Sequence, residues 1–239
     1  MGRAHEVRAA SMAKTAARKS KLYSIYAKEI YQAAKSNPDP VSNDILRRVI
    51  EKAKREQVPA DVINRNIDKA KKGGAGEDYV TVEYEAYGPA GSSLIIKCLT
   101  DNTNRSIAEV KTVFNKCGAK MASQGAVSYM YEHLGMVGIK NHNEEEIMEA
   151  LINADVDAND IEVEEDMVIV YTEVQDLNNA KKALETAFEN ITFELDEISY
   201  FAKDTITIDN EEEKQKFERL INMLEDVDDV SNVYHNVNL

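Results

Sequence analysis

Residues 136–200 have the sequence MVGIKNHNEEEIMEALINADVDANDIEVEEDMVIVYTEVQDLNNAKKALETAFENITFELDEISY, and their pattern indicates the fold class. Within it, apolar residues recur at helical spacing over residues 144–154 and 177–188. Short apolar or alternating runs, which are typical of strands, stand before, between and after these helices. The strands are predicted at residues 136–139, 161–164, 167–172 and 193–200. The order βαββαβ predicts a ferredoxin-like α+β domain over residues 136–200.

The segments on both sides of this stretch contain further strands and helices. Before it, strands are predicted at residues 80–87, 94–99 and 126–131, and a helix at 104–117. After it, a strand, a helix and a strand are predicted at residues 205–208, 211–224 and 230–237. A β-α-β tail could not bury its apolar faces by itself. We therefore expect residues 77–135 and 201–239 to form a second ferredoxin-like domain, into which 136–200 is inserted. The alternative is three consecutive units, with the tail as a small appendage.

Residues 1–76 are predicted to form a basic helical domain. Between about residues 11 and 72, apolar residues recur three and four positions apart in three windows, which predicts three helices. The run Asn37-Pro38-Asp39-Pro40 ends the first helix, and Ser42 or Asn43 can cap the second. Val58-Pro59 separates the second helix from the third. Residues 73–76 are rich in glycine but lack the Gly-Lys-Ser/Thr ending of a phosphate-binding loop, so we expect a hinge there.

The charge is divided along the chain. The whole sequence has 29 Lys and Arg against 43 Asp and Glu, a net charge of −14. Residues 1–76 contain 17 of these cations and 8 of the acids, a balance of +9, so the remainder stands at −23. An acidic protein repels nucleic acid on average, whereas a segregated basic domain attracts it.

The cations of this basic domain are the predicted nucleic-acid-binding residues. They lie beside the apolar stripes of the three helices and can neutralise phosphates, with an attraction that weakens steeply as salt rises. The predicted set is Lys14, Arg18, Lys21, Lys28, Arg47, Arg48, Lys52, Lys54, Arg55, Arg65 and Lys69. The alternative is an ordinary solvated surface of a helical bundle, and the two short helices around Val58-Pro59 are only a weak indication of a helix-turn-helix.

The sequence offers no catalytic or cofactor-binding pattern. Its four histidines are scattered, and no metal-ligand pair or nucleophile motif is present, so we expect no enzyme activity, no metal and no cofactor. The many acidic runs are interpreted as solvated helix faces or caps. Two cysteines without ligand spacing favour a reducing cytoplasm, and the absence of an 18-residue apolar run argues against a membrane partner.

Two loops of the acidic part are candidate functional loops. One contains Tyr87, Gly88 and Pro89, which permit a tight exposed turn between two strands. The other runs from a strand end to a helix start and contains Asp101, Asn102, Asn104 and Arg105. Its small polar residues can cap the helix while Asp101 pairs with Arg105, or its amides can hold an anion.

These loops, together with the tail, resemble the YebC/PmpR family over nearly the whole chain. The shared motifs are Tyr84-Glu85-Ala86-Tyr87-Gly88-Pro89, Leu99-Thr100-Asp101-Asn102 with Asn104-Arg105, Gly125-Ala126-Val127-Ser128-Tyr129-Met130, and Leu224-Glu225-Asp226 followed by Val233-Tyr234-His235-Asn236. The basic domain adds Leu46-Arg47, Ile50, Lys52-Ala53-Lys54 and Val58-Pro59. The start Gly2-Arg3-Ala4-His5-Glu6 lacks the Trp of many members and looks more like the YeeN-type branch.

The resemblance implies a DNA-binding transcriptional regulator. Some members are instead implicated in translation at the ribosome, including relief of stalling on proline-rich stretches, and a mitochondrial relative activates translation of cytochrome c oxidase subunit one. DNA and ribosomal RNA therefore both stand as partners, the second together with the ribosome. A small-molecule-sensing module and an adaptor for a basic protein are further alternatives, the former only by analogy of fold.

Overall fold

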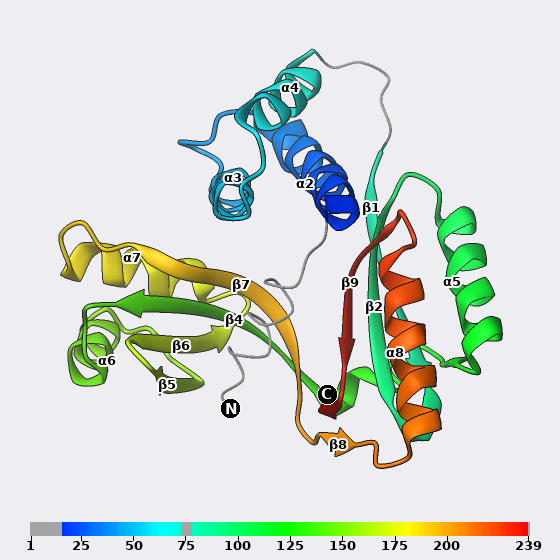
Figure 1. Cartoon of the computed structure of the whole chain (residues 1–239). Helices are drawn as coiled ribbons and strands as arrows, with labels where there is room; N and C mark the ends of the chain where they lie inside the picture. Colours follow the sequence, from blue (N-terminus) through cyan, green and yellow to red (C-terminus); the bar gives the residue numbers. More distant parts are fainter. Residues whose placement is uncertain (1–15, 73–77, 239) are drawn as a thin grey trace. The chain divides into compact units, whose positions relative to one another are not determined.

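The computed structural model describes residues 16–72 and 78–238, and the side chains from residue 19 onward within the first of these ranges (Figure 1). The helical domain consists of α2 (Ala16–Ser36), α3 (Asp44–Arg55) and α4 (Ala60–Lys71). The three predicted helices are thus present in the described range, whereas the predicted hinge at residues 73–76 lies outside the described residues.

Apolar side chains from all three helices form the core of the helical domain. Its fully buried members are Tyr26, Ile30, Ala34, Leu46, Ile50, Ala53, Val58, Ile63 and Ile67. Asn43 is the N-cap of α3, since its side-chain oxygen accepts a hydrogen bond from the Leu46 N–H at 3.0 Å. The Asn43 side chain also donates to the backbone carbonyls of Ala33 and Asn37, at 2.9 and 2.6 Å. One buried amide therefore fixes the turn between α2 and α3.

The first sheet has the strand order β3-β1-β2-β9. Its strands are β1 (Val80–Tyr87), β2 (Ser93–Thr100), β3 (Lys120–Met121) and β9 (Val230–His235). Helices α5 (Thr103–Cys117) and α8 (Glu211–Glu225) pack on it around Phe114, Phe217 and Leu220, which are almost completely buried. A short parallel pair joins β8 (Ile206–Thr207) to β10 (Val237–Asn238).

The strand predicted over residues 126–131 is wrong. Residues 128–130 form a 3-10 helix, η2 (Ser128–Met130), and the next strand starts only at Tyr131. The reason is the carboxylate of Glu85, which accepts hydrogen bonds from the backbone N–H groups of Gly125, Val127 and Ser128. Amides committed to one carboxylate cannot form a strand ladder. The place of this strand in the sheet is taken by β1, which pairs with β2 along its whole length as an antiparallel hairpin.

The second sheet has the strand order β5-β6-β4-β7. Its elements are β4 (Tyr131–Lys140), α6 (Glu144–Asn153), β5 (Asp160–Glu164), β6 (Met167–Glu173), α7 (Leu177–Ala187) and β7 (Phe193–Ala202). This is the predicted βαββαβ order with the ferredoxin-like arrangement of strands. Side chains from α6 and α7, such as Ile147 and Leu184, pack on one face of the sheet against Val137 and Val170.

The predicted α+β class, with three N-terminal helices followed by two sheet-containing parts, is confirmed. Among the described residues, contacts divide the chain into two compact units. One is residues 132–201, and the other is residues 16–131 together with 202–238. The helical domain therefore belongs to the same unit as the first sheet, and the contacts between them include two of the predicted binding residues, Lys21 and Lys28.

Candidate nucleic-acid interface

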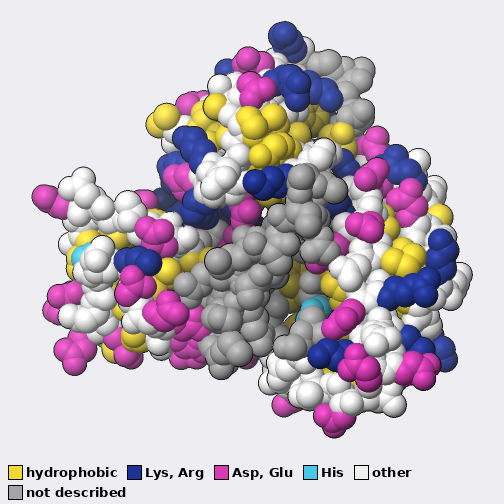
Figure 2. Space-filling view, viewed as in Figure 1, with side chains coloured by type: hydrophobic (Ala, Val, Ile, Leu, Met, Phe, Trp, Pro, Cys, Tyr) yellow, Lys and Arg dark blue, Asp and Glu magenta, His cyan; other side chains and the backbone are white. Residues whose placement is uncertain are grey.

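Helices α3 and α4 carry cations that face away from the core of the helical domain. Lys54 and Arg65 are exposed and Arg48 is partly exposed. Their side chains form no hydrogen bond or ion pair with any other residue in the described part of the chain. Figure 2 shows Lys and Arg side chains over both helices. Because these cations have no such partner among the described residues, they can approach phosphates without breaking a hydrogen bond or ion pair of that part of the chain.

Other predicted cations of α3 and α4 have partners close by. The Arg47 guanidinium lies 2.9 Å from the carboxylate of Asp44, one turn earlier, and both side chains are more than one-third exposed. Lys69 stands over the ring of Tyr31, with its Nζ 5.1 Å from the ring centroid. Lys52 and Arg55 also take part in interactions. Exposed pairs of this kind contribute little to stability, so a phosphate can displace them.

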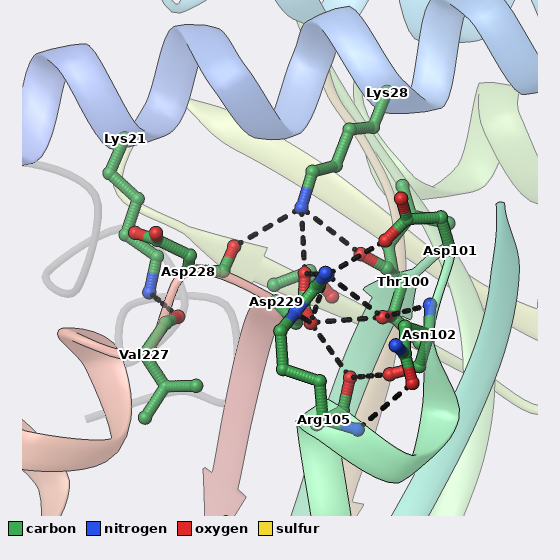
Figure 3. Close-up of polar contacts among 12 residues, drawn as sticks. Lys21, Lys28, Thr100, Asp101, Asn102, Arg105, Val227, Asp228 and Asp229 are labelled. Carbon is green, nitrogen blue, oxygen red and sulfur yellow. Dashed lines mark hydrogen bonds and ion pairs between the residues drawn. The ribbon is translucent and has the colours of Figure 1, made fainter. Parts of the chain in front are cut away.

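The predicted cations of α2 lie in different surroundings. The ammonium of Lys28 is 3.0 Å from Oδ1 of Asp229 and donates to the carbonyl of Leu99 at 3.3 Å (Figure 3). The ammonium of Lys21 donates to the carbonyl of Val227 at 2.6 Å and to that of Glu225. Burial lowers the pKa of Lys21, and nearby carboxylates only partly offset this. Lys21 and Lys28 thus hold α2 against the first sheet, and they do not join the outward-facing cations. Lys14, and the side chain of Arg18, lie outside the described residues.

Asp229 is the centre of this contact. It is 2% exposed, and its carboxylate accepts hydrogen bonds from Nε and Nη2 of Arg105 at 3.0 and 2.8 Å. The hydroxyls of Thr100 and Ser106 donate to the same carboxylate at 2.9 and 2.8 Å (Figure 3). Burial by itself would raise the pKa of Asp229, but the bonds from Arg105, Lys28, Ser106 and Thr100 outweigh it and lower that pKa to about 2. The carboxylate is therefore a permanent negative charge at the junction.

The loop of Asp101, Asn102, Asn104 and Arg105 serves the same junction. The Asn102 side chain caps α5 by accepting from the Arg105 N–H at 3.1 Å, and Arg105 also pairs with Asp101 at 2.7 Å. The capping alternative with an Asp101–Arg105 pair is therefore what the structure contains. Asn104 is exposed on the first turn of α5. The loop thus places the Arg105 guanidinium within hydrogen-bond distance of Asp229.

The cleft beside this junction has mixed charge. It measures about 660 Å³. Its charged lining residues are Lys21, Lys28, Arg105, Asp101, Glu109, Asp228 and Asp229. With three cations and four carboxylates, the cleft offers no net positive charge to a phosphate. The described cations that could attract a polyanion are therefore those of α3 and α4.

The loop of Tyr87, Gly88 and Pro89 has separate structural and exposed parts. Gly88 is required by close packing, since a Cβ there would lie 2.5 Å from Oγ of Ser92 and 2.9 Å from Cδ1 of Leu94. Pro89 is buried, whereas Tyr87 is 42% exposed and its hydroxyl donates to the carbonyl of Ala126 at 2.8 Å. Only Tyr87 of this loop presents a large side chain to solvent.

Sequence reasoning missed Asp229. The acidic run Asp226–Asp229 was interpreted as a solvated face or cap, and that is wrong for Asp229, which is buried and paired with cations more than a hundred residues away. One signal was available, because Asp229 directly precedes the apolar Val230 that starts β9. A residue at a strand start can point into the core, but no spacing in the sequence links it to Lys28 or Arg105.

No group of three or more His, Cys, Asp or Glu side chains in the described ranges is arranged to hold a metal ion. The two cysteines are buried and free, and burial raises the pKa of Cys98 to about 12, which leaves its thiol protonated. No described helix combines the length and the apolar character needed to cross a membrane.

The chain has a cationic three-helix domain joined to an antiparallel sheet, and a ferredoxin-like sheet is inserted between segments of that part. These features define the class as two-sheet α+β proteins with a basic N-terminal helical domain. Comparison with protein families gives two matches. Residues 3–73 match the TACO1/YebC protein N-terminal domain, and residues 79–237 match the TACO1/YebC second and third domain. The chain belongs to the TACO1/YebC family.

Individual relatives agree with this assignment. A "probable transcriptional regulatory protein" of Pseudoalteromonas translucida is 51% identical, over 99% of this chain and 98% of its own. One of the same name from Marinobacter nauticus is 48% identical over 100% of this chain and 99% of its own. The crystal structure of a conserved hypothetical protein from Aquifex aeolicus is similar with a TM-score of 0.75 and 35% identity, covering 95% of this chain and 93% of that one.

Proposed function

We propose that this protein is a non-enzymatic regulator of gene expression that binds nucleic acid through the outward-facing cations of α3 and α4. The observation that carries the proposal is that Lys54 and Arg65 are exposed and Arg48 is partly exposed, and that none of the three side chains has a hydrogen bond or ion pair among the described residues. The names of the relatives favour transcription as the regulated process and DNA as the ligand. The buried free thiols Cys98 and Cys117 fit the cytoplasm as its location.

The physical basis of binding is the release of counterions from the nucleic-acid backbone. Each neutralised phosphate of a duplex contributes about −0.9 to the slope of log affinity against log salt concentration. If Arg48, Lys54 and Arg65 each meet one phosphate, the slope is about −3. The acidic remainder of the chain adds repulsion at long range, so binding is expected to weaken sharply between low and physiological salt.

The test is a pair of matched charge reversals. Arg48→Glu with Lys54→Glu changes two outward cations of the helical domain, and Lys111→Glu with Lys116→Glu changes two exposed cations of α5 by the same total charge. Affinity for a labelled 30-base-pair DNA duplex is measured by fluorescence anisotropy at several salt concentrations. The first variant is expected to bind at least tenfold more weakly, with a slope near −1, while the second keeps the slope of the parent.

Equal affinity of the two variants would overturn the proposal, provided that circular dichroism shows both folded. A labelled ribosomal RNA hairpin in a second set of titrations tests RNA as the ligand. Co-sedimentation with ribosomes, with and without nuclease, tests the translation alternative. The translation alternative is supported by the net charge of −23 on residues 77–239, since this acidic part could face basic ribosomal proteins.

A further inference from the structure

Two tyrosines of the unit that contains the first sheet, residues 16–131 and 202–238, have side chains exposed to solvent. Tyr129 is 67% exposed and Tyr87 is 42% exposed. They are the only aromatic residues among the large hydrophobic side chains exposed in the described part of the chain. An exposed tyrosine presents an apolar face that a planar group can cover.

The two tyrosines belong to one local arrangement. The Tyr87 hydroxyl donates to the carbonyl of Ala126 at 2.8 Å, so its ring is tied to the loop that leads to Tyr129. That loop closes into η2 through a hydrogen bond from the Met130 N–H to the Val127 carbonyl at 2.9 Å. Tyr87 and Tyr129 therefore come from segments that are about forty residues apart in sequence but bonded to each other in the fold.

Two lysines frame these tyrosines. Lys120 on β3 is the direct antiparallel partner of Tyr87, and its side chain is exposed. The backbone N–H of Lys203, another exposed lysine, donates to the carbonyl of Met130 at 2.9 Å, next to Tyr129. The exposed acids nearest in the chain are Asp204 and Glu83. The partly exposed Glu132 and the charged carboxylate of Glu85 lie close by as well, so the acids outnumber the two lysines. Any attraction for a nucleic-acid strand therefore depends on the rings more than on the lysines.

The loop that carries Tyr129 is held firmly from beneath. Glu85 is 7% exposed, and its carboxylate accepts from Gly125 N–H at 2.7 Å, from Ser128 N–H at 3.0 Å and from Val127 N–H. Burial opposes the charged form, but these three bonds outweigh it and lower the pKa of Glu85. A loop fixed in this way loses little conformational freedom when a ligand covers its ring.

We propose that Tyr87 and Tyr129, flanked by Lys120 and Lys203, form a stacking site for unpaired bases of a nucleic-acid strand. Base stacking on aromatic side chains tolerates any sequence, because every base has a flat face, and lysines beside the rings can contact the neighbouring phosphates. The inference rests on the proposed nucleic-acid function and sharpens it. The cations of α3 and α4 attract paired and unpaired strands alike, whereas the tyrosine site adds affinity only where bases are unstacked.

The test uses the absence of tryptophan from this chain. A Tyr129→Trp variant contains a single tryptophan, at the proposed site, which can be excited selectively over the tyrosines. An Ile152→Trp variant places its single tryptophan at a position of similar exposure in the other unit. Titration with a 15-nucleotide oligothymidine is expected to quench the first fluorophore and leave the second unchanged. A 15-base-pair blunt duplex is expected to quench neither.

A second measurement needs no introduced tryptophan and follows the anisotropy of a labelled oligonucleotide. Tyr129→Ala is expected to weaken binding of the oligothymidine about tenfold in anisotropy, while Tyr129→Phe retains the ring and the affinity. Duplex affinity stays unchanged in both variants, because duplex binding depends on α3 and α4.

The outcomes separate the two proposals. If the protein binds both oligonucleotides and Tyr129→Ala leaves the affinity for the single strand unchanged, the stacking site is refuted while the proposed function stands. Quenching of Tyr129→Trp by the duplex as strongly as by the single strand would also refute it. If neither oligonucleotide binds at any salt concentration, both proposals fail.

Discussion

The cations of α2 and those of α3 belong to one small helical domain and have opposite surroundings. Lys28 is bonded to Asp229 and to the carbonyl of Leu99, and Lys21 to carbonyls at the end of α8. Arg48 and Lys54 project from the domain without a partner among the described residues. The cations of one helical domain can therefore serve two purposes, attachment to the acidic sheet and the proposed attraction of an outside polyanion. Tertiary contacts decide whether a given cation is paired within the protein or faces solvent.

The contact between α2 and the first sheet has the buried carboxylate of Asp229 at its centre. Mutations there are therefore expected to lower stability more than mutations of the outward-facing cations. Arg105 and Lys28 neutralise Asp229, and two hydroxyls complete its hydrogen bonds. Removing one charge of a buried pair leaves the others without compensation, a loss that exceeds the strength of any exposed pair. Within the described ranges, the outward-facing cations of α3 and α4 have no buried carboxylate as a partner.

The largest expected effect is therefore that of Asp229→Asn. Loss of the charge leaves Lys28 and Arg105 facing a neutral amide, and the free energy of unfolding is expected to fall by about 3 kcal/mol. Urea unfolding followed by circular dichroism measures it. Asp228→Asn, at the exposed neighbouring position, is the control and should change stability by no more than about 0.5 kcal/mol. Equal losses in the two variants would show that Asp229 is not the centre of the attachment.

A second prediction concerns acid. The folded-state pKa of Asp229 is about 2, below the ordinary value of 3.8, so its charged form stabilises the fold. This stabilisation is complete above about pH 4 and is lost as pH falls through 2, because protons then bind the folded state as well. A difference of this size is worth about 2 kcal/mol. The stability gap between the parent and Asp229→Asn should shrink by that amount between pH 5 and pH 1.5.

The other carboxylates titrate in both proteins, so their contribution cancels in the difference between the two free energies of unfolding. A gap that stays constant over this pH range would mean that the charge of Asp229 does not stabilise the folded state. Stability of both variants has to be measured at constant ionic strength, since exposed pairs are screened by salt.

The sequence predicted the local elements well because their causes are local. The spacing of Tyr26 and Ile30 places α2, and the Asn43 cap places the start of α3. The ferredoxin-like order of residues 131–202 also follows from periodicity alone. The error at residues 126–131 arose because Glu85, forty residues earlier, binds the amides that a strand would need.

The candidate site was only partly predictable, and for the same reason. A helical period places Lys28 and Lys54 alike outside the helical core, and it does so correctly. What separates them is Asp229, which lies about two hundred residues from Lys28 and reaches it only through the pairing of β9 with β2. Charge counts give the sign of a surface, whereas the pairing of each charge requires the fold.

The smallest expected effect on stability comes from a direct comparison of one lysine from each region, Lys28 of α2 and Lys54 of α3. Lys28→Met removes one partner of Asp229 while Arg105 remains, and is expected to lower the free energy of unfolding by about 1 kcal/mol. Lys54→Met is expected to change stability by less than about 0.5 kcal/mol, since its side chain is exposed and has no hydrogen bond or ion pair among the described residues. Affinity for duplex DNA at low salt should respond in the opposite sense, falling several-fold for Lys54→Met and little for Lys28→Met. If Lys28→Met instead weakens binding as much as Lys54→Met without loss of stability, the lysines of α2 are part of the binding surface and the distinction between the two regions is refuted.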